Sequence, residues 1–145
     1  MSNQSSMANG KPADLKLSDW VKSGAVAAII SIAVVLVVRA VAIAIWPEIA
    51  LFTPLDSYLR AIIFTLVPAI VATALFAWLV GHAKQPIRTF IIISVVVLVI
   101  SFIPDYILPD PHKTFLASTV AAVLHVAAAI PIVAVLVMGY QRQTG

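Results

Sequence analysis

Four long runs of apolar residues divide the chain, and short polar stretches separate them. The runs cover residues 24–46, 59–80, 89–108 and 115–140. A helix that crosses the hydrocarbon core of a membrane needs about 20 mostly apolar residues, so each run is long enough. Valine and isoleucine are frequent in the runs, but backbone groups in lipid must be hydrogen-bonded within their own segment. The pattern therefore predicts four transmembrane helices rather than strands.

Prolines mark the places where three of these helices are predicted to begin. Thr53-Pro54 precedes the second run, Pro86 the third and Asp110-Pro111 the fourth. Proline fits the first turn of a helix, where its missing N–H group is not needed. The connections between the runs are short, which makes consecutive helices antiparallel. We therefore expect an all-α fold, a four-transmembrane-helix antiparallel up-down bundle.

The start of the chain differs from the rest. Residues 1–10 are rich in serine, asparagine and glutamine, a composition typical of a disordered segment. Leucine and tryptophan side chains just after them favour one or two amphipathic turns on the membrane surface. A signal peptide is the less favoured interpretation, because Arg39 interrupts the first run. We expect a disordered, interfacial cytoplasmic tail over residues 1–19 and a transmembrane domain over residues 20–145.

The composition excludes several classes of protein. Hydrophobic residues make up 62% of the chain and charged residues 10%, whereas a soluble domain has about 45–50% and about 25%. An ordinary soluble domain and a nucleic-acid-binding protein are thus excluded. Cysteine is absent, which excludes disulfide scaffolds and thiolate metal sites. The lipid bilayer is the expected partner.

The positive charges are distributed unequally between the two sides of the predicted bundle. The side of the N-terminus carries Lys11, Lys16, Lys22, Lys84, Arg88 and Arg142, and the opposite side carries Arg60 and Lys113. Lysine and arginine accumulate on the cytoplasmic side of membrane proteins. The sequence therefore predicts a multi-pass protein of the bacterial inner membrane with both termini in the cytoplasm.

Two charged residues form the first part of a possible intramembrane polar site. Arg39 lies inside the first run, where a charge costs about 2.5–3.5 kcal/mol on insertion scales unless it snorkels, pairs or lines a cavity. Asp105 lies near the end of the third run, on the side away from the termini. One interpretation pairs Arg39 with Asp105 or with another acid on that side. The other leaves Asp105 facing water at that surface.

His125 is the third residue of this possible site. It lies ten residues into the fourth run, near the expected centre of the bilayer. An imidazole at this depth forms a hydrogen bond to a neighbouring helix, carries protons, or binds haem or a pigment. His82 and His112 fall in connections on opposite faces, so no second buried histidine supports a bis-histidine haem. His125 is thus a weak candidate cofactor ligand, and we expect neither cofactor nor metal.

No motif for catalysis is present. A nucleotide-binding loop, a zinc-binding HExxH motif and a serine elbow are all missing from the sequence, so no catalytic residue is predicted. The leading interpretation is a non-enzymatic accessory or structural subunit, or a lipid-embedded binding module. Frequent small residues are compatible with a homo-oligomer or a membrane-complex partner. The alternatives are a small transporter or channel subunit that uses Arg39 and His125, and a haem- or pigment-binding subunit that uses His125.

Several short stretches also suggest a family. They are residues 66–69, 85–90, 99–104 and 124–129. In this order they resemble an uncharacterised bacterial family of four-helix integral membrane proteins, a domain of unknown function. The resemblance extends from the first run to Val137. It implies the four-helix topology and places Arg88 and His125 in contexts like those of the family, but it implies no activity.

Overall fold

The computed structural model describes residues 15–145, and these residues form four long helices and two short 3-10 helices. The elements are α1 (Leu17–Ile45), η1 (Pro47–Leu51), η2 (Thr53–Leu55), α2 (Tyr58–His82), α3 (Pro86–Ile107) and α4 (Phe115–Thr144). No strand occurs within this range. All four long helices are long and apolar enough to cross a membrane. The predicted all-α fold of a small multi-pass membrane protein is confirmed.

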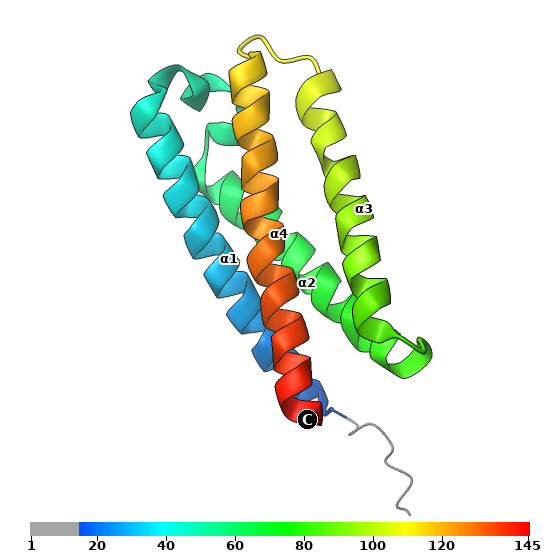
Figure 1. Cartoon of the computed structure of the whole chain (residues 1–145). Helices are drawn as coiled ribbons and strands as arrows, with labels where there is room; N and C mark the ends of the chain where they lie inside the picture. The colour runs from blue at the N-terminus through cyan, green and yellow to red at the C-terminus, as the bar shows by residue number, and fades with distance from the viewer. Residues whose placement is uncertain (1–14) are drawn as a thin grey trace, which may run out of the picture.

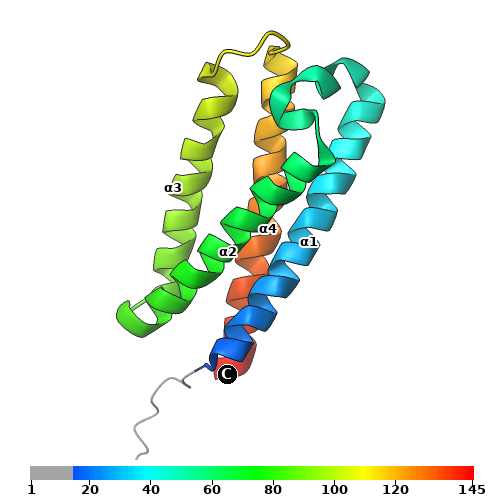
Figure 2. The same ribbon diagram turned by 180° about the vertical axis from the view of Figure 1, so that it is seen from behind.

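The helices alternate in direction, and α4 lies between α1 and α3 (Figure 1). Helix α2 crosses the bundle obliquely, from α1 at one end to α3 at the other (Figure 2). We call the half with the start of α1, the end of α4 and the α2–α3 connection the terminal half. The half with η1, η2 and the α3–α4 connection is the loop half. The oblique course of α2 leaves α2 and α3 further apart in the loop half.

Helix α1 begins earlier than predicted. It starts at Leu17 rather than Gly24, so residues 17–19 belong to the helix and not to a tail. The physical reason is a cap: the Asp19 carboxylate accepts a hydrogen bond from the backbone N–H of Lys16 at 3.1 Å. Trp20 then packs into the bundle instead of lying on the membrane surface. The tail predicted for residues 1–14 lies outside the described residues.

The capping residues of two other helices also differ from the prediction. Thr53-Pro54 forms η2, and Asp110-Pro111 forms a turn, each before its helix begins. Ser57 and Thr114 are the N-caps of α2 and α4, and their hydroxyl oxygens accept hydrogen bonds from backbone N–H groups three residues later, at 3.5 and 3.0 Å. Pro86 does begin α3, as predicted.

The core of the terminal half is built around an aromatic side chain of α2. Phe76 stacks on Phe90 of α3, with 4.5 Å between the ring centroids. Trp20 of α1 and Tyr140 of α4 meet Phe76 edge-on, at 5.6 and 5.5 Å. All four helices therefore contribute to one cluster, in which Phe76 and Phe90 are fully buried.

The core of the loop half is formed largely by the connection between α1 and α2. Ile49, Phe52 and Leu55 are buried against α1, α2 and α4. Small residues of α4, including Ala117 and Ala121, leave room for them. The connection is thus folded into the bundle rather than laid over its end, and it brings backbone carbonyl groups close to the side chains of α1.

Candidate functional site

Arg39 holds this connection against α1. Arg39 is 4% exposed, and its Nε and Nη2 atoms donate hydrogen bonds to the carbonyl oxygen of Leu55 at 3.0 and 2.5 Å. The same guanidinium lies over the ring of Tyr58, 4.0 Å from the centroid. Arg39 therefore has a structural partner, the backbone of η2, at the depth where the sequence placed an intramembrane charge.

The predicted pair between Arg39 and Asp105, or another acid, is wrong. Among residues 15–145, Arg39 forms no salt bridge, and the only ionisable partner of Asp105 is His125. The reason is the order of the helices: α4 separates α1 from α3 (Figure 1). Arg39 consequently faces η2, while Asp105 faces α4.

Asp105 and His125 approach each other across α3 and α4. Asp105 is 6% exposed, and its Oδ2 atom lies 3.4 Å from Nδ1 of His125. Helical side chains lean toward the N-terminus of their own helix, so in two antiparallel helices these side chains lean toward each other. The backbone of Asp105 is also fixed, because Ser118 Oγ donates a 2.7 Å hydrogen bond to its carbonyl oxygen. His125 thus contacts the carboxylate of a neighbouring helix, but its hydrogen bond among the described residues is to Ala121 of its own helix rather than across helices, as the sequence suggested.

One oxygen of the Asp105 carboxylate nevertheless has no hydrogen-bond donor among the described residues. Its Oδ2 atom is buried and accepts no hydrogen bond from the described residues. His125 Nδ1 is closer to the carbonyl oxygen of Ala121, at 2.9 Å, and one N–H group cannot point in line at both acceptors. A buried carboxylate oxygen without a donor is uncommon and costly in free energy. This atom has unused capacity to accept a hydrogen bond.

Asp105 and His125 line a cavity in the loop half. Its volume is about 560 Å³, and α2, α3, α4 and η2 surround it. Most of the wall is apolar, including Phe64 and Leu124, and Thr65 adds a hydroxyl group. A concave, mostly apolar cavity of about 300–1,000 Å³ with a few polar groups is typical of a small-molecule site. Arg39 is not part of its wall.

The other charged groups of the cavity wall already have partners. Arg60 forms a 2.9 Å salt bridge with Asp56 and also donates to the carbonyl oxygen of Thr53. Asp110 accepts hydrogen bonds from the backbone N–H groups of Thr53 and His112, at 3.1 and 2.8 Å. Hydrogen bonds from Thr53, and then from His112, hold the pKa of Asp110 below its usual value.

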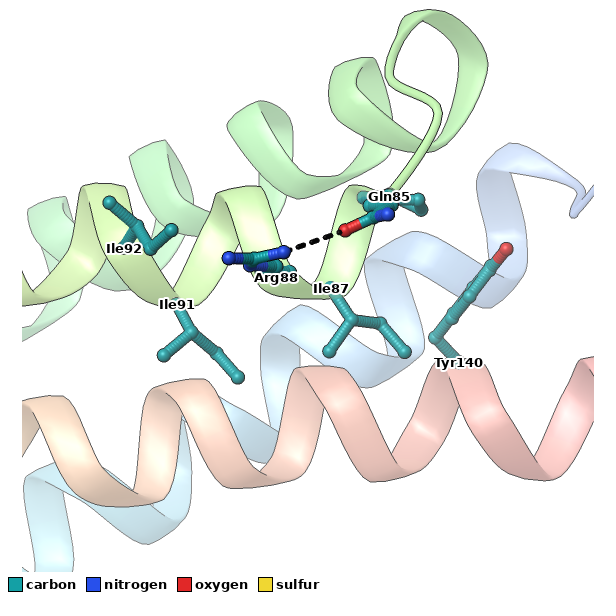
Figure 3. A pocket seen from close by; sticks show the side chains of 7 residues that line it. Gln85, Ile87, Arg88, Ile91, Ile92 and Tyr140 are labelled. Carbon is teal, nitrogen blue, oxygen red and sulfur yellow. Dashed lines mark hydrogen bonds between the residues drawn. The ribbon is translucent and has the colours of Figure 1, made fainter.

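A second depression lies in the terminal half, between α3 and α4 (Figure 3). Ile87 and Ile91 of α3 and Tyr140 of α4 line it, and Arg88 donates a 3.4 Å hydrogen bond to Gln85. This groove is open, and the Arg88 side chain lies along the surface rather than inside the bundle. It lacks a buried polar group of the kind that Asp105 provides.

Two residues that bond to backbone carbonyl groups near the end of α3 were not singled out as site residues from the sequence. Ser118 fixes Asp105, and Lys113 Nζ donates to the carbonyl oxygens of Tyr106 and Leu108 at 3.2 and 3.0 Å. The last carbonyl groups of a helix have no partner within the helix, and a cation there is favourable. The signals available were a lysine shortly after the end of the third run and a serine near the start of the fourth run. Within residues 15–145, no group of three or more His, Cys, Asp or Glu side chains could hold a metal ion.

Comparisons with known proteins give one result. The model of a family described only as a family of unknown function, DUF6069, matches residues 16–143. This range contains all four long helices except one residue at the end of α4. No curated protein and no solved structure matches the chain. The match agrees with the resemblance seen in the sequence and carries no activity.

Proposed function

The chain belongs to the DUF6069 family of unknown function, and we propose that it is a non-enzymatic binding module of the membrane. It holds a small, mostly apolar molecule in the cavity of the loop half. The observation that carries the proposal is the cavity itself: about 560 Å³, a largely apolar wall and the Asp105–His125 contact. Such a site suits a molecule that enters from the bilayer.

Binding is favoured over transport by the packing of the terminal half. A transported molecule would have to leave the cavity toward the end of the bundle that carries the termini. Phe76, Phe90 and Leu136 are fully buried there and fill the space between the helices. Arg39, one of the two residues on which the transporter alternative rests, is bonded to the carbonyl oxygen of Leu55 and does not itself line the cavity.

The proposed orientation places both termini in the cytoplasm of a bacterial cell and the loop half toward the outer surface of the inner membrane. The excess of lysine and arginine near the termini supports it. The chain has no cysteine, so single cysteines at Glu48 and Gln143, both exposed, report the orientation directly. In intact cells, a membrane-impermeant thiol reagent should label the cysteine at position 48 and spare the one at position 143. The opposite pattern would contradict the orientation.

Binding is tested with N-phenyl-1-naphthylamine, a neutral apolar fluorophore, and the full chain in non-ionic detergent micelles. Protein-free micelles give the baseline. We expect a saturable rise in fluorescence above this baseline. Ala128 lines the cavity, so Ala128→Trp should fill it and abolish the saturable part. Ile130→Trp, on an exposed face of the same helix, is the matched control and should bind like the wild type. A wild-type chain without saturable binding would overturn the proposal.

A further inference from the structure

The cavity contains one buried side-chain polar atom that no described residue satisfies. Asp105 lines the wall with a side chain that is 94% buried (6% exposed), and its Oδ2 atom accepts no hydrogen bond from residues 15–145. The remaining charged groups of the wall, Arg60 and Asp110, are held by their own partners. A ligand that enters the cavity therefore meets one buried side-chain acceptor without a partner, and that acceptor is a carboxylate.

No strong cation of the protein balances this carboxylate. Within the described residues, no lysine or arginine forms a salt bridge with Asp105. Arg39 is committed to the carbonyl oxygen of Leu55, and His125 places Nδ1 nearer to Ala121 than to the carboxylate. A buried negative charge is stabilised most by a positive charge in direct contact with it. The carboxylate is thus suited to a positively charged group from outside the chain.

The rest of the wall sets the shape of the molecule that carries this charge. Phe52 and Leu55 of the connection, Phe64 of α2 and Leu124 of α4 line the same cavity with apolar surface. We propose that the cavity binds a lipophilic amine, whose protonated nitrogen donates to Asp105 while its apolar body lies against these residues. This inference rests on the proposed function, because it names the ligand class of the same cavity.

A charged hydrogen bond to Asp105 distinguishes a protonated amine from other lipophilic molecules. A protonated primary amine offers N–H donors to Oδ2, whereas a quaternary ammonium group offers charge alone, and an alcohol offers a hydroxyl without charge. A hydrogen bond between charged groups contributes more to the binding free energy than one between neutral groups. The amine should therefore bind about tenfold or more tighter than the alcohol. Binding should therefore weaken from decylamine to decyltrimethylammonium to decanol.

The test compares these three molecules as competitors of N-phenyl-1-naphthylamine, with the full chain in non-ionic micelles. Decylamine should displace the fluorophore from the wild type at about one-tenth of the concentration that decanol needs. In Asp105→Asn, decylamine and decanol should displace the fluorophore at similar concentrations. Glu48→Gln, which removes an exposed carboxylate of the same half that lies outside the cavity wall, is the matched control and should keep the preference for the amine.

The outcomes separate this inference from the proposed function. Saturable fluorophore binding without a preference for the amine in the wild type would overturn the inference and leave the binding module intact. A preference that persists in folded Asp105→Asn would overturn the role of this carboxylate. If Asp105→Asn does not fold, thermal unfolding of the wild type decides. Decylamine should then raise Tm at about one-tenth of the decanol concentration, and an equal effect of the two would overturn the inference.

Discussion

The helices of the two halves of this bundle are held together by different contacts. In the terminal half, the four helices meet through stacked and edge-on aromatic rings around Phe76, which is fully buried. In the loop half, the two buried charged residues of the described chain, Arg39 and Asp105, replace part of this packing, and a cavity of about 560 Å³ lies between the helices. Lipid is as apolar as leucine, so helices in a membrane gain little from apolar contact alone. Close aromatic packing joins the helices of the terminal half, whereas the loop half combines an apolar core with polar contacts.

The path of α2 explains why the halves differ. It lies near α3 in the terminal half and near α1 in the loop half (Figure 2). The connection between α1 and α2 packs against α1, α2 and α4, where Arg39 fixes Leu55. The space beside α3 stays open, with Asp105 and His125 in its wall.

The largest expected effect tests the packing of the terminal half. Phe76 and Phe64 lie on the same helix, but they are 0% and 69% exposed. Phe76→Ala should lower the free energy of unfolding by about 3–5 kcal/mol, as for other large-to-small changes in a core. Phe64→Ala, the matched control, should cost less than about 1 kcal/mol. Unfolding of the purified variants in mixed micelles measures both values. Equal losses would show that the terminal half is not the better packed one.

An intermediate effect tests the polar contacts of the loop half. Arg39→Leu leaves the buried carbonyl oxygen of Leu55 without its donor. The free energy of unfolding should fall by about 1–3 kcal/mol, the cost of an unsatisfied buried acceptor. Arg39→Lys, which keeps one donor, should lose less. Limited proteolysis should also cut the connection at residues 47–55 faster in Arg39→Leu. If Arg39→Leu is as stable and as resistant to proteolysis as the wild type, Arg39 does not hold the connection in place.

The smallest effect concerns Asp110, a charged residue of the cavity wall. The pKa of Asp110 is lowered in the folded state by hydrogen bonds from Thr53 and His112, so its ionised form stabilises the fold. This contribution is complete above the unfolded pKa, which is about 4, and it is lost as the pH falls through the folded pKa. Asp110→Asn should therefore lower Tm slightly at pH 7, and the difference should disappear in acid. A difference that is the same at both pH values would contradict the role of the charge.

Much of this architecture could be predicted from the sequence, because lipid permits few choices. Apolar runs of this length must be helices, and short connections make them antiparallel. Arg39, Asp105 and His125 were recognisable as polar residues within or beside these runs. The ends of α2, α3 and α4 were close to prediction, although Ser57 and Thr114 rather than the residues before the prolines are the caps.

The contacts between the polar residues could not be predicted. Depth along the run suggested a pair between Arg39 and Asp105, but depth does not tell which helix lies between two others. Asp105 instead meets His125, because their side chains lean toward each other from antiparallel helices. The position of Leu55 depends on the fold of a nine-residue connection, residues 47–55, whose apolar residues are too short a pattern to predict that it enters the bundle.

The central claim is that the loop half contains the binding site and the terminal half does not. Photolabelling with an alkyl amine that carries a diazirine tests it most directly, with the full chain in non-ionic micelles and mass spectrometry of the labelled peptides. We expect saturable labelling near Phe64 and Leu124, which excess decylamine suppresses and Ala128→Trp abolishes. Saturable labelling at Ile91 and Tyr140 in the groove of the terminal half (Figure 3), or labelling without saturation over all lipid-facing positions, would contradict it.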